Sequence, residues 1–306
     1  MPDFDIRPLG ATAYLAPEGF AHELAAELGE GPAHGPRLFV VPGEAHAAHW
    51  AQNVWPDLVE IRFVSIGAAA KAMRALTRNW SLYPTGLYRR AALIEAKLPH
   101  VSGKPLVFPA AAPVAPLGCW TLLEPDRLIA SPHGASPFPN GEARFVEDRA
   151  GPPSRAYLKL WEALALAGQW PRSGQRCLDL GAAPGGWTWA LAELGATVTS
   201  VDKAPLDPRV AALPNVTHRQ ESAFGLDPAA EAPLDWIVSD IVCYPERLVR
   251  LVLAWLERHP QASFIVTVKF QGATDMAALQ PLIAVPGSRL RHLYHNKHEL
   301  TWSLIR

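Results

Sequence analysis

The sequence predicts an α/β protein of two domains: a smaller N-terminal α+β domain over residues 1–145, and a C-terminal domain over residues 146–306 built on a seven-stranded, mainly parallel sheet. The chain has 306 residues, enough for two cores of about 150 residues each. Hydrophobic residues make up 49% and charged residues 19%, as in an ordinary folded protein. After residue 146, apolar strands alternate regularly with helical stretches, which is typical of a parallel sheet covered by helices on both faces.

The N-terminal domain mixes strand and helix patterns. Strands are expected at residues 11–15 and 37–41 and in a hairpin formed by residues 119–123 and 127–130. Helices are expected at residues 20–28, 68–76 and 88–98, where apolar side chains recur at helical spacing. Prolines recur among small residues between Val101 and Leu117, which predicts a linker or an irregular edge.

The C-terminal domain follows a more regular order. Strands are expected at residues 176–180, 197–202, 216–220, 234–241, 262–270, 289–295 and 300–305, and helices at residues 187–194, 246–259 and 273–283. Only residues 296–299 separate the last two strands, so these strands should pair as an antiparallel hairpin at one edge of the sheet.

Several protein classes fit the sequence poorly. No apolar run approaches the roughly 20 residues of a membrane helix, and the first residues lack the layout of a signal peptide, so we expect a cytoplasmic protein without membrane contact. The three cysteines, Cys119, Cys177 and Cys243, are far apart in the chain. They predict neither a disulfide framework nor a zinc site, and we expect them to be small buried residues.

Charge is balanced overall but is distributed unevenly in the N-terminal domain. Residues 1–60 hold nine acidic groups against two basic ones, and residues 61–104 hold eight basic groups against one acidic one. The two segments could face and neutralise each other, or the basic segment could form a patch for a polyanion. Lys71, Arg74 and Arg78 are spaced to share one helix face, which slightly favours the patch.

The strand at residues 176–180 runs through a glycine-rich turn directly into a helix. Glycine lets the backbone approach a ligand closely and supplies positive φ without steric cost. The residues expected to hold a ligand there are Gly181, Ala183, Pro184, Gly185, Gly186 and Trp187. Because the spacing differs from G-x-G-x-x-G and Pro184 interrupts it, both an NAD site and a P-loop are disfavoured.

Two further positions fit a nucleoside ligand. Asp202 closes the second strand, where an acidic residue can accept hydrogen bonds from ribose hydroxyls. In the turn after the third strand, Ser222 is the candidate to face an adenine, with Glu221 as the alternative.

Residues 179–187, with the sequence DLGAAPGGW, resemble the cofactor loop of FtsJ-type RNA 2′-O-ribose methyltransferases. The resemblance implies a Rossmann-like seven-stranded methyltransferase sheet and S-adenosylmethionine as cofactor. These enzymes share a Lys-Asp-Lys-Glu tetrad, and the implied counterparts are Lys159, Asp240, Lys269 and Glu299. Lys159 lies in a segment similar to the family's SRxxxKL helix, and Asp240 would also contact the cofactor.

Three longer segments are similar to bacterial enzymes that methylate a cytidine ribose of 23S rRNA in the large ribosomal subunit. They are SPFPNGEARF at residues 136–145, PPSRAYLKLWEA at residues 152–163 and LYHNKHELTW at residues 293–302. This resemblance covers about residues 118–306. It implies 23S rRNA or a pre-assembly large-subunit particle as partner, and a shortened THUMP-like RNA-binding region within residues 1–145.

The chemistry needs these residue types. A ribose hydroxyl is a very weak acid, so its oxygen must lose a proton as it attacks a methyl carbon. A lysine can accept that proton only when neutral, and a nearby ammonium and partial burial both lower a lysine pKa. We assign Lys269 as the base and Lys159 as the cation that stabilises the developing oxyanion, while Asp240 and Glu299 orient the lysines and the hydroxyl.

Two other functions are compatible with the sequence. The same fold could methylate tRNA, an mRNA cap or a small-molecule hydroxyl, although the basic segment favours a large polyanion. A non-catalytic RNA-binding or assembly factor would normally have lost part of the tetrad, and here the tetrad is complete.

Overall fold

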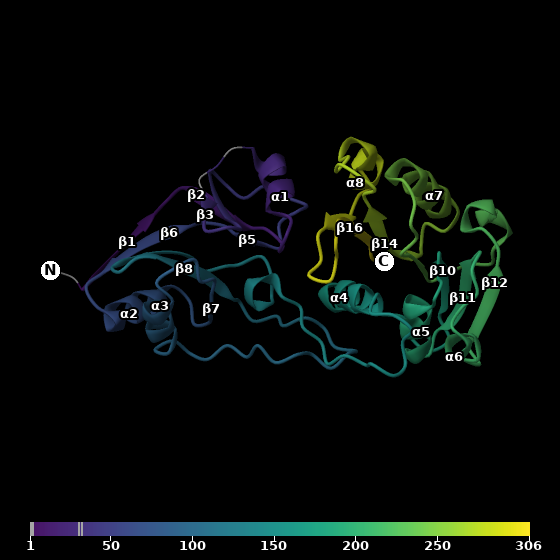
Figure 1. Cartoon of the computed structure of the whole chain (residues 1–306), viewed down its shortest axis with the longest axis horizontal. Coiled ribbons are helices and arrows are strands. Elements are labelled where there is room, and N and C mark those ends of the chain that lie inside the picture. Colours follow the sequence, from purple (N-terminus) through teal and green to yellow (C-terminus); the bar gives the residue numbers. More distant parts are fainter. Residues whose placement is uncertain (1–2, 30, 32) are drawn as a thin grey trace. The chain divides into compact units, whose positions relative to one another are not determined.

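The structure is a computed structural model that describes residues 3–29, 31 and 33–306 (Figure 1). The chain divides into two compact units: the first comprises Met1–Pro105 and Ala112–Arg144, and the second comprises Leu106–Ala111 and Phe145–Arg306. Leu106–Ala111 was expected in the N-terminal domain. It belongs to the second unit because Phe108 stacks on Trp161, with ring centroids 4.8 Å apart, and Leu106 forms a β-bridge with Phe145.

The described part of the first unit contains two sheets and three α-helices. The five-stranded sheet has the order β1 (Phe4–Pro8), β6 (Val59–Phe63), β9 (Arg127–Ser131), β8 (Gly118–Glu124) and β7 (Trp80–Leu82). The four-stranded sheet has the order β3 (Ala33–His34), β4 (Leu38–Pro42), β2 (Ala11–Leu15) and β5 (Asn53–Trp55). The helices are α1 (Ala21–Leu28), α2 (Ile66–Leu76) and α3 (Tyr88–Glu95), with a 3₁₀ turn η1 (Pro139–Gly141).

The predicted elements of this unit are present, but five strands were not predicted. The hairpin β8–β9 is confirmed, and β2 matches its expected bounds. α3 ends at Glu95, three residues before the expected end. Strands β1, β3, β5, β6 and β7 were missed; they are only two to five residues long.

The second unit contains the predicted seven-stranded Rossmann-like sheet. Its order is β12 (Val216–Gln220), β11 (Thr197–Asp202), β10 (Arg176–Leu180), β13 (Trp236–Ser239), β14 (Ser263–Lys269), β16 (Glu299–Leu304) and β15 (Arg289–Arg291). Neighbouring strands from β12 to β14 run parallel, and β16 pairs antiparallel with both β14 and β15. The carboxyl ends of the parallel strands therefore meet at one edge of the sheet, and β16 begins at that same edge.

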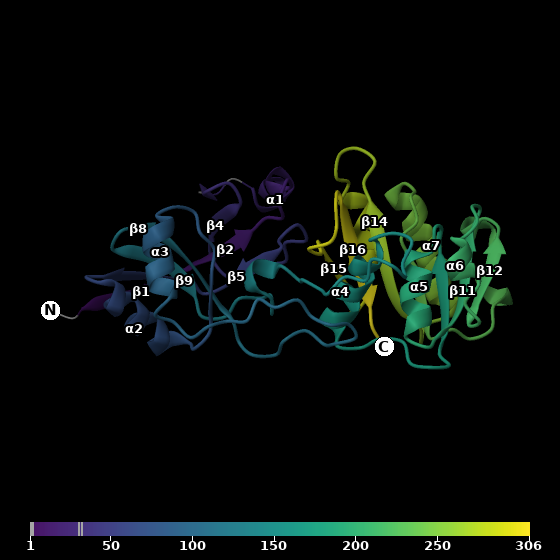
Figure 2. The same cartoon turned by 60° about the horizontal axis from the view of Figure 1, so that its bottom comes forward.

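Helices cover both faces of this sheet, as Figures 1 and 2 show. They are α4 (Tyr157–Ala167), α5 (Gly186–Glu193) and α6 (Pro208–Ala211) on one side and α7 (Pro245–Arg258) and α8 (Gln280–Ile283) on the other, with 3₁₀ turns η2 (Ala223–Gly225), η3 (Pro228–Ala230) and η4 (Ala277–Leu279). The buried strands β13 and β14 form the centre of the core.

Three predicted elements of the second unit are shorter than expected. The strand expected at residues 234–241 spans only Trp236–Ser239. The strand expected at residues 289–295 ends at Arg291, because the backbone N–H groups of Tyr294 and His295 donate to the carboxylate of Glu162 instead of to a strand. The helix expected at residues 273–283 is wrong in its first half. There the Asp275 carboxylate accepts a hydrogen bond from the N–H of Ala278, a capping contact that starts the helical segment only after Asp275.

The cysteines are buried and free, as predicted. Within the described residues, no helix combines the length and apolar character needed to cross a membrane.

Candidate active site

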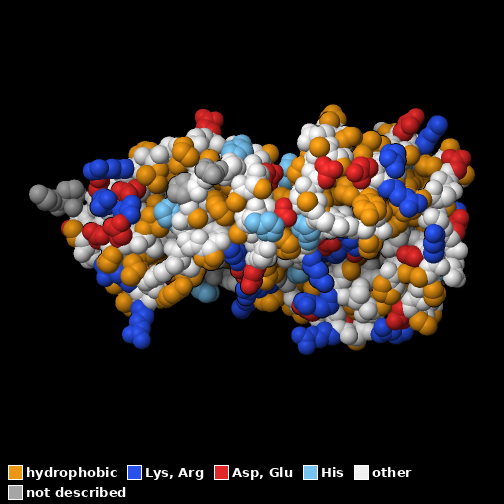
Figure 3. Space-filling model, turned by 45° about the horizontal axis from the view of Figure 1, so that its top comes forward, with side chains coloured by type: hydrophobic (Ala, Val, Ile, Leu, Met, Phe, Trp, Pro, Cys, Tyr) orange, Lys and Arg blue, Asp and Glu red, His pale blue; other side chains and the backbone are white. Residues whose placement is uncertain are grey.

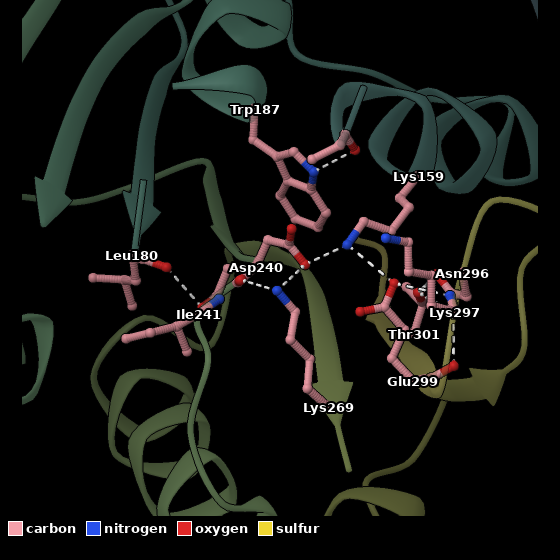
Figure 4. A network of polar contacts seen from close by, with 12 residues as sticks. Lys159, Leu180, Trp187, Asp240, Ile241, Lys269, Asn296, Lys297, Glu299 and Thr301 are labelled. Atoms are coloured by element: carbon pink, nitrogen blue, oxygen red, sulfur yellow. Dashed lines mark hydrogen bonds and ion pairs between the residues drawn. The ribbon is translucent and has the colours of Figure 1, made fainter. Parts of the chain in front are cut away.

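The structure brings the four tetrad residues together at the carboxyl edge of the sheet (Figure 4). Lys159 comes from the first turn of α4, and Asp240 directly follows β13. Lys269 is the last residue of β14 and Glu299 the first of β16, and these two residues are direct partners in the antiparallel ladder. Residues more than a hundred positions apart in the chain thus share one site because of the strand order.

The tetrad forms one continuous network of ion pairs. The Nζ of Lys159 donates to Oδ1 of Asp240 at 2.6 Å and lies 3.1 Å from Oε1 of Glu299. The Nζ of Lys269 lies 3.0 Å from the same Oδ1 and donates to the backbone carbonyl of Asp240 at 2.5 Å. Lys159 and Glu299 are buried, whereas Lys269 and Asp240 are partly exposed.

Neighbouring groups hold the carboxylate of Glu299 in place. Its Oε1 accepts a hydrogen bond from the N–H of Lys297, and the side-chain amide of Asn296 donates to the backbone carbonyl of Glu299 and to Thr301. On α4, the buried Glu162 accepts hydrogen bonds from the N–H groups of Tyr294 and His295. The loop that precedes Glu299 is therefore attached to the helix that carries Lys159.

A cavity of about 440 Å³ opens beside this network. Most residues predicted for the site line it: Gly181, Ala183, Pro184, Gly186, Trp187, Asp202, Ser222, Asp240 and Lys269. Lys159, Glu299 and Gly185 are not among the lining residues. Of the two tetrad lysines, only Lys269 faces the space where a ligand would lie.

The glycine-rich turn is built for close backbone approach. A Cβ on Gly181 would lie 2.6 Å from the side chain of Ile241, and the φ of Gly181 is +80°. A Cβ on Gly186 would lie 2.7 Å from the hydroxyl of Ser154. Gly185, with a φ of +110°, instead packs toward Leu206 and Val210 just before α5. Gly185 therefore shapes the turn without lining the cavity.

The two nucleoside positions differ in their surroundings. Asp202 lines the cavity, and its oxygens accept hydrogen bonds from the N–H groups of Ala183 and Ala204. Ser222 lines the cavity as well, whereas Glu221 forms an ion pair with Arg219 at 2.7 Å and is not among the lining residues.

The sequence analysis did not single out Asp179 as a site residue. Its carboxyl group is fully enclosed at the end of β10, where Oδ2 accepts a hydrogen bond from Thr188 at 2.6 Å and Oδ1 has no hydrogen-bond partner among the described residues. Burial, together with the charges of Asp240 and Asp202, raises the pKa of Asp179 to about 7. A carboxylate inside the apolar strand RCLDL was the available signal.

Phe224 and Arg247 also line the cavity and were not predicted. The guanidinium of Arg247, on α7, lies 3.7 Å from the centre of the Phe224 ring. A flat, stacked pair of this kind offers a surface for a planar ligand.

Comparison with known proteins agrees with this geometry. Residues 152–265 match the model of the FtsJ-like methyltransferase family. The matched residues lie within the second unit. The matched region begins just before α4 and includes the glycine-rich turn, Lys159 and Asp240.

Curated relatives match about half of this chain. A protein named ribosomal RNA large subunit methyltransferase M from Halorhodospira halophila is 39% identical over 172 residues, which cover 54% of this chain and 50% of that protein. A protein of the same name from Aromatoleum aromaticum is 35% identical over 190 residues, covering 56% of this chain and 50% of that protein. The matched region thus spans about half the length of these relatives.

Likeness to solved structures is weaker. The Methanococcus jannaschii fibrillarin pre-rRNA processing protein superposes with a TM-score of 0.35 at 15% identity, covering 44% of this chain and 67% of that protein. A likeness at this level carries no argument about function.

Proposed function

We propose that this protein transfers a methyl group from S-adenosylmethionine to a ribose 2′-hydroxyl of RNA. The observation that carries the proposal is the position of Lys269. Lys269 lines the cavity, and its amine lies 3.0 Å from the carboxylate of Asp240. The ammonium of Lys159 contacts the same carboxylate oxygen. A family match over residues 152–265 and the names of the relatives support the same reaction.

The residues around the cavity fit S-adenosylmethionine. The unpartnered Oδ1 of Asp179 is an acceptor for the amino group of the methionine part, and Asp202 is an acceptor for the ribose hydroxyls. Ser222, Phe224 and Arg247 offer a polar edge and a flat surface for the adenine. When bound, the cofactor supplies an electrophilic methyl group on a sulfonium.

The tetrad residues divide the remaining work. Lys269 accepts the proton of the ribose hydroxyl as the oxygen forms its bond to the methyl carbon and the carbon–sulfur bond breaks. Lys159 stabilises the negative charge that develops on the oxygen, and Asp240 and Glu299 hold both amines in position. Alignment of oxygen, carbon and sulfur would supply much of the rate.

Lys269 suits the role of base better than Lys159. Lys159 is held by two carboxylates and does not line the cavity. Lys269 contacts one carboxylate oxygen, which it shares with Lys159, and it faces the cavity. Lys159 is therefore fixed as a cation behind the residues that line the cavity, whereas Lys269 can reach a substrate.

The proposal includes the RNA substrate. The expected target is a cytidine of 23S rRNA, methylated before or during assembly of the large subunit. Of the eight basic residues in residues 61–104, only Arg62 forms an ion pair with a carboxylate in the described part of the chain. Figure 3 shows acidic and basic side chains interleaved near the N-terminal end of the first unit. In the first unit, Arg7 pairs with Asp5 and Arg62 with Glu60. The other seven basic residues have no carboxylate partner there, although Arg74 and Arg90 donate to backbone carbonyls, and this excess of positive charge supports RNA binding by this unit.

A lysine substitution tests the proposed reaction. Lys269→Ala should reduce methyl transfer to undermethylated 23S rRNA by at least a hundredfold, as expected for loss of a general base, while binding of S-adenosylhomocysteine changes little. Radiolabelled transfer and calorimetry measure the two quantities. Arg250→Ala, on an exposed position of α7, is the matched control and should retain activity. Full activity of Lys269→Ala would rule out the assigned base.

The same assay separates RNA classes. Transfer to 23S rRNA from cells that lack the protein should exceed transfer to tRNA, and mapping of the 2′-O-methyl group in that rRNA identifies the nucleotide. If the protein methylated only tRNA, the proposed rRNA substrate would be wrong, whereas the proposed 2′-O-methyl transfer would stand.

A further inference from the structure

The second unit has another cavity, separate from the one beside the tetrad. It has a volume of about 300 Å³ and lies between the end of α4 and the edge strands β15 and β16. Its polar lining includes Arg289 and Arg291 of β15, Ser303 of β16 and Gln169 just after α4. Arg289 and Arg291 are two residues apart on a strand, so their side chains leave the same face of the sheet.

The charge in this cavity is unbalanced. Two guanidinium groups line it and no carboxylate does. Within the described residues, the side chains of Arg289 and Arg291 form no hydrogen bond or ion pair, and the hydroxyl of Ser303 has no hydrogen-bond partner either. The end of α4 supplies only about half a negative charge, too little to neutralise two cations.

The nearest carboxylate is already engaged. Glu162 interacts electrostatically with Arg291, but its oxygens accept hydrogen bonds from the N–H groups of Tyr294 and His295 and from the His295 ring. Burial lowers the pKa of Arg291 below its ordinary value, and the charge of Arg289 lowers it further. A partly buried, unpaired arginine is unfavourable in the fold and is relieved by an anion.

We propose that this cavity is a binding site for a phosphate group. A guanidinium presents two parallel N–H donors that match two phosphate oxygens, and the Ser303 hydroxyl adds a third donor. Because the lining has donors of positive charge and no carboxylate, it suits an anion and not a cation or a neutral apolar ligand.

The position of the site allows two sources of phosphate. Thr301 and Ser303 follow Glu299 on the same face of β16, opposite Arg291 and Arg289 in the ladder. At about 3.4 Å per residue, the two arginines lie about 7 and 14 Å along the sheet from Glu299. A phosphodiester of RNA a few nucleotides from the methylated ribose could reach this region, an option that rests on the proposed function. A free phosphate or the phosphate of a small molecule is the other source.

Inorganic phosphate tests the site directly on the full chain. Thermal unfolding is measured in phosphate and in chloride at equal ionic strength. Phosphate should raise the midpoint of the wild-type protein, and the double variant Arg289→Met/Arg291→Met should bind phosphate at least tenfold more weakly. Arg250→Met, which removes an exposed arginine on α7, is the matched control and should keep the response.

The same variants identify the source of the phosphate. If RNA supplies it, the KM for 23S rRNA rises about tenfold in the double variant while kcat and the affinity for S-adenosylhomocysteine stay the same. A response to inorganic phosphate with an unchanged KM points to a small molecule. Absence of both effects overturns the proposal. Thermal unfolding does not depend on methyl transfer. The phosphate-binding test would therefore remain valid even if the proposed methyltransferase function were wrong.

A third measurement separates a binding role from a structural one. In chloride, Arg291→Met should unfold at an equal or higher temperature than the wild type, because an unpaired charge is replaced by an apolar side chain of similar length. A clear fall in the unfolding temperature would show that the guanidinium has partners within the fold, and would overturn the proposal.

Discussion

At the scale of single residues, Asp179 is where charge and burial conflict most directly. Its carboxyl group is enclosed, one oxygen lacks a partner, and burial raises its pKa to about 7. Below that pH the group is neutral, and above it the carboxylate can pair with the cationic amino group of a bound cofactor. Cofactor affinity should therefore increase with pH in a window that this residue sets.

We predict that S-adenosylhomocysteine binds about fivefold more tightly at pH 7.5 than at pH 6, since Asp179 ionises across this range while the ligand's ammonium stays charged. Calorimetry at a series of pH values measures this. Asp179→Asn should bind weakly with little pH dependence. An unchanged pH profile in Asp179→Asn would assign the dependence to another group.

The same pKa has a consequence for stability without ligand. The folded-state value lies above the ordinary value of 3.8, so the unfolded chain releases its proton first as pH rises. The contribution of Asp179 to stability is thus fully present below about pH 4 and declines up to about pH 7.

Single residues also show how far the sequence could predict the site. Lys159, Asp240, Lys269 and Glu299 were placed by resemblance, and their strand-end positions predicted one shared edge. The enclosure of Asp179 and its missing partner depend on side chains from other elements, which no local pattern reveals.

At the scale of elements, the contact between α4 and the loop before β16 matters most for the site. The buried carboxylate of Glu162 accepts three hydrogen bonds from Tyr294 and His295, at 2.7 to 3.0 Å. The helix that carries Lys159 and the loop that leads to Glu299 are thereby joined.

We predict that Glu162→Ala lowers the free energy of unfolding by about 3 kcal/mol, because buried donors lose their acceptor. Methyl transfer should fall as well, because Glu299 loses its support. Denaturant unfolding and the transfer assay measure both effects. Glu162→Gln retains one carbonyl acceptor and should lose roughly half as much stability. Equal stability of all three proteins would show that the loop holds itself in place.

Elements were predicted best where pattern and pairing are both local. The hairpin β8–β9 is one such case. Strands β1 and β6 pair with each other although more than fifty residues separate them, and each is only five residues long. Short segments of this kind become strands through their distant partner, so their own sequence is weak evidence.

At the scale of the whole molecule, the path of the chain between the units is the main departure from the expected domains. Phe108 stacks on Trp161 and meets Phe145 edge-on, with ring centroids 6.3 Å apart. The contact joins residues more than fifty positions apart, so a division drawn from composition could not assign Leu106–Ala111 to the second unit.

We predict that Phe108→Ala destabilises the second unit by about 2 kcal/mol, less than for a fully buried phenylalanine because the ring is only partly covered. Tryptophan fluorescence during denaturant unfolding reports this through Trp161. Val107→Ala, at a side chain that is 71% exposed, should have no effect. A similar loss in both variants would indicate a general effect of the segment.

The basic surface of the first unit gives a prediction about RNA. Lys71, Arg78 and Arg89 are exposed and have no ion-pair partner in the described residues. Replacing all three by alanine should weaken RNA binding and reduce the slope of log affinity against log salt by about 2, with cofactor affinity unchanged. Arg62→Ala is the control, because Arg62 already pairs with Glu60. An unchanged slope would place the RNA contact elsewhere.

The antiparallel pairing of β14 with β16 determines which insertions and deletions near Glu299 the protein can tolerate. The backbone hydrogen bonds of the ladder keep Lys269 opposite Glu299. If the register shifted by one residue, Leu300 would lie opposite Lys269, and the carboxylate of Glu299 would point to the other face of the sheet. Insertions that lengthen the turn before Glu299 should therefore be better tolerated than a single deletion within Glu299–Leu304. The length of the turn before Glu299 can therefore change more easily than the number of residues within β16.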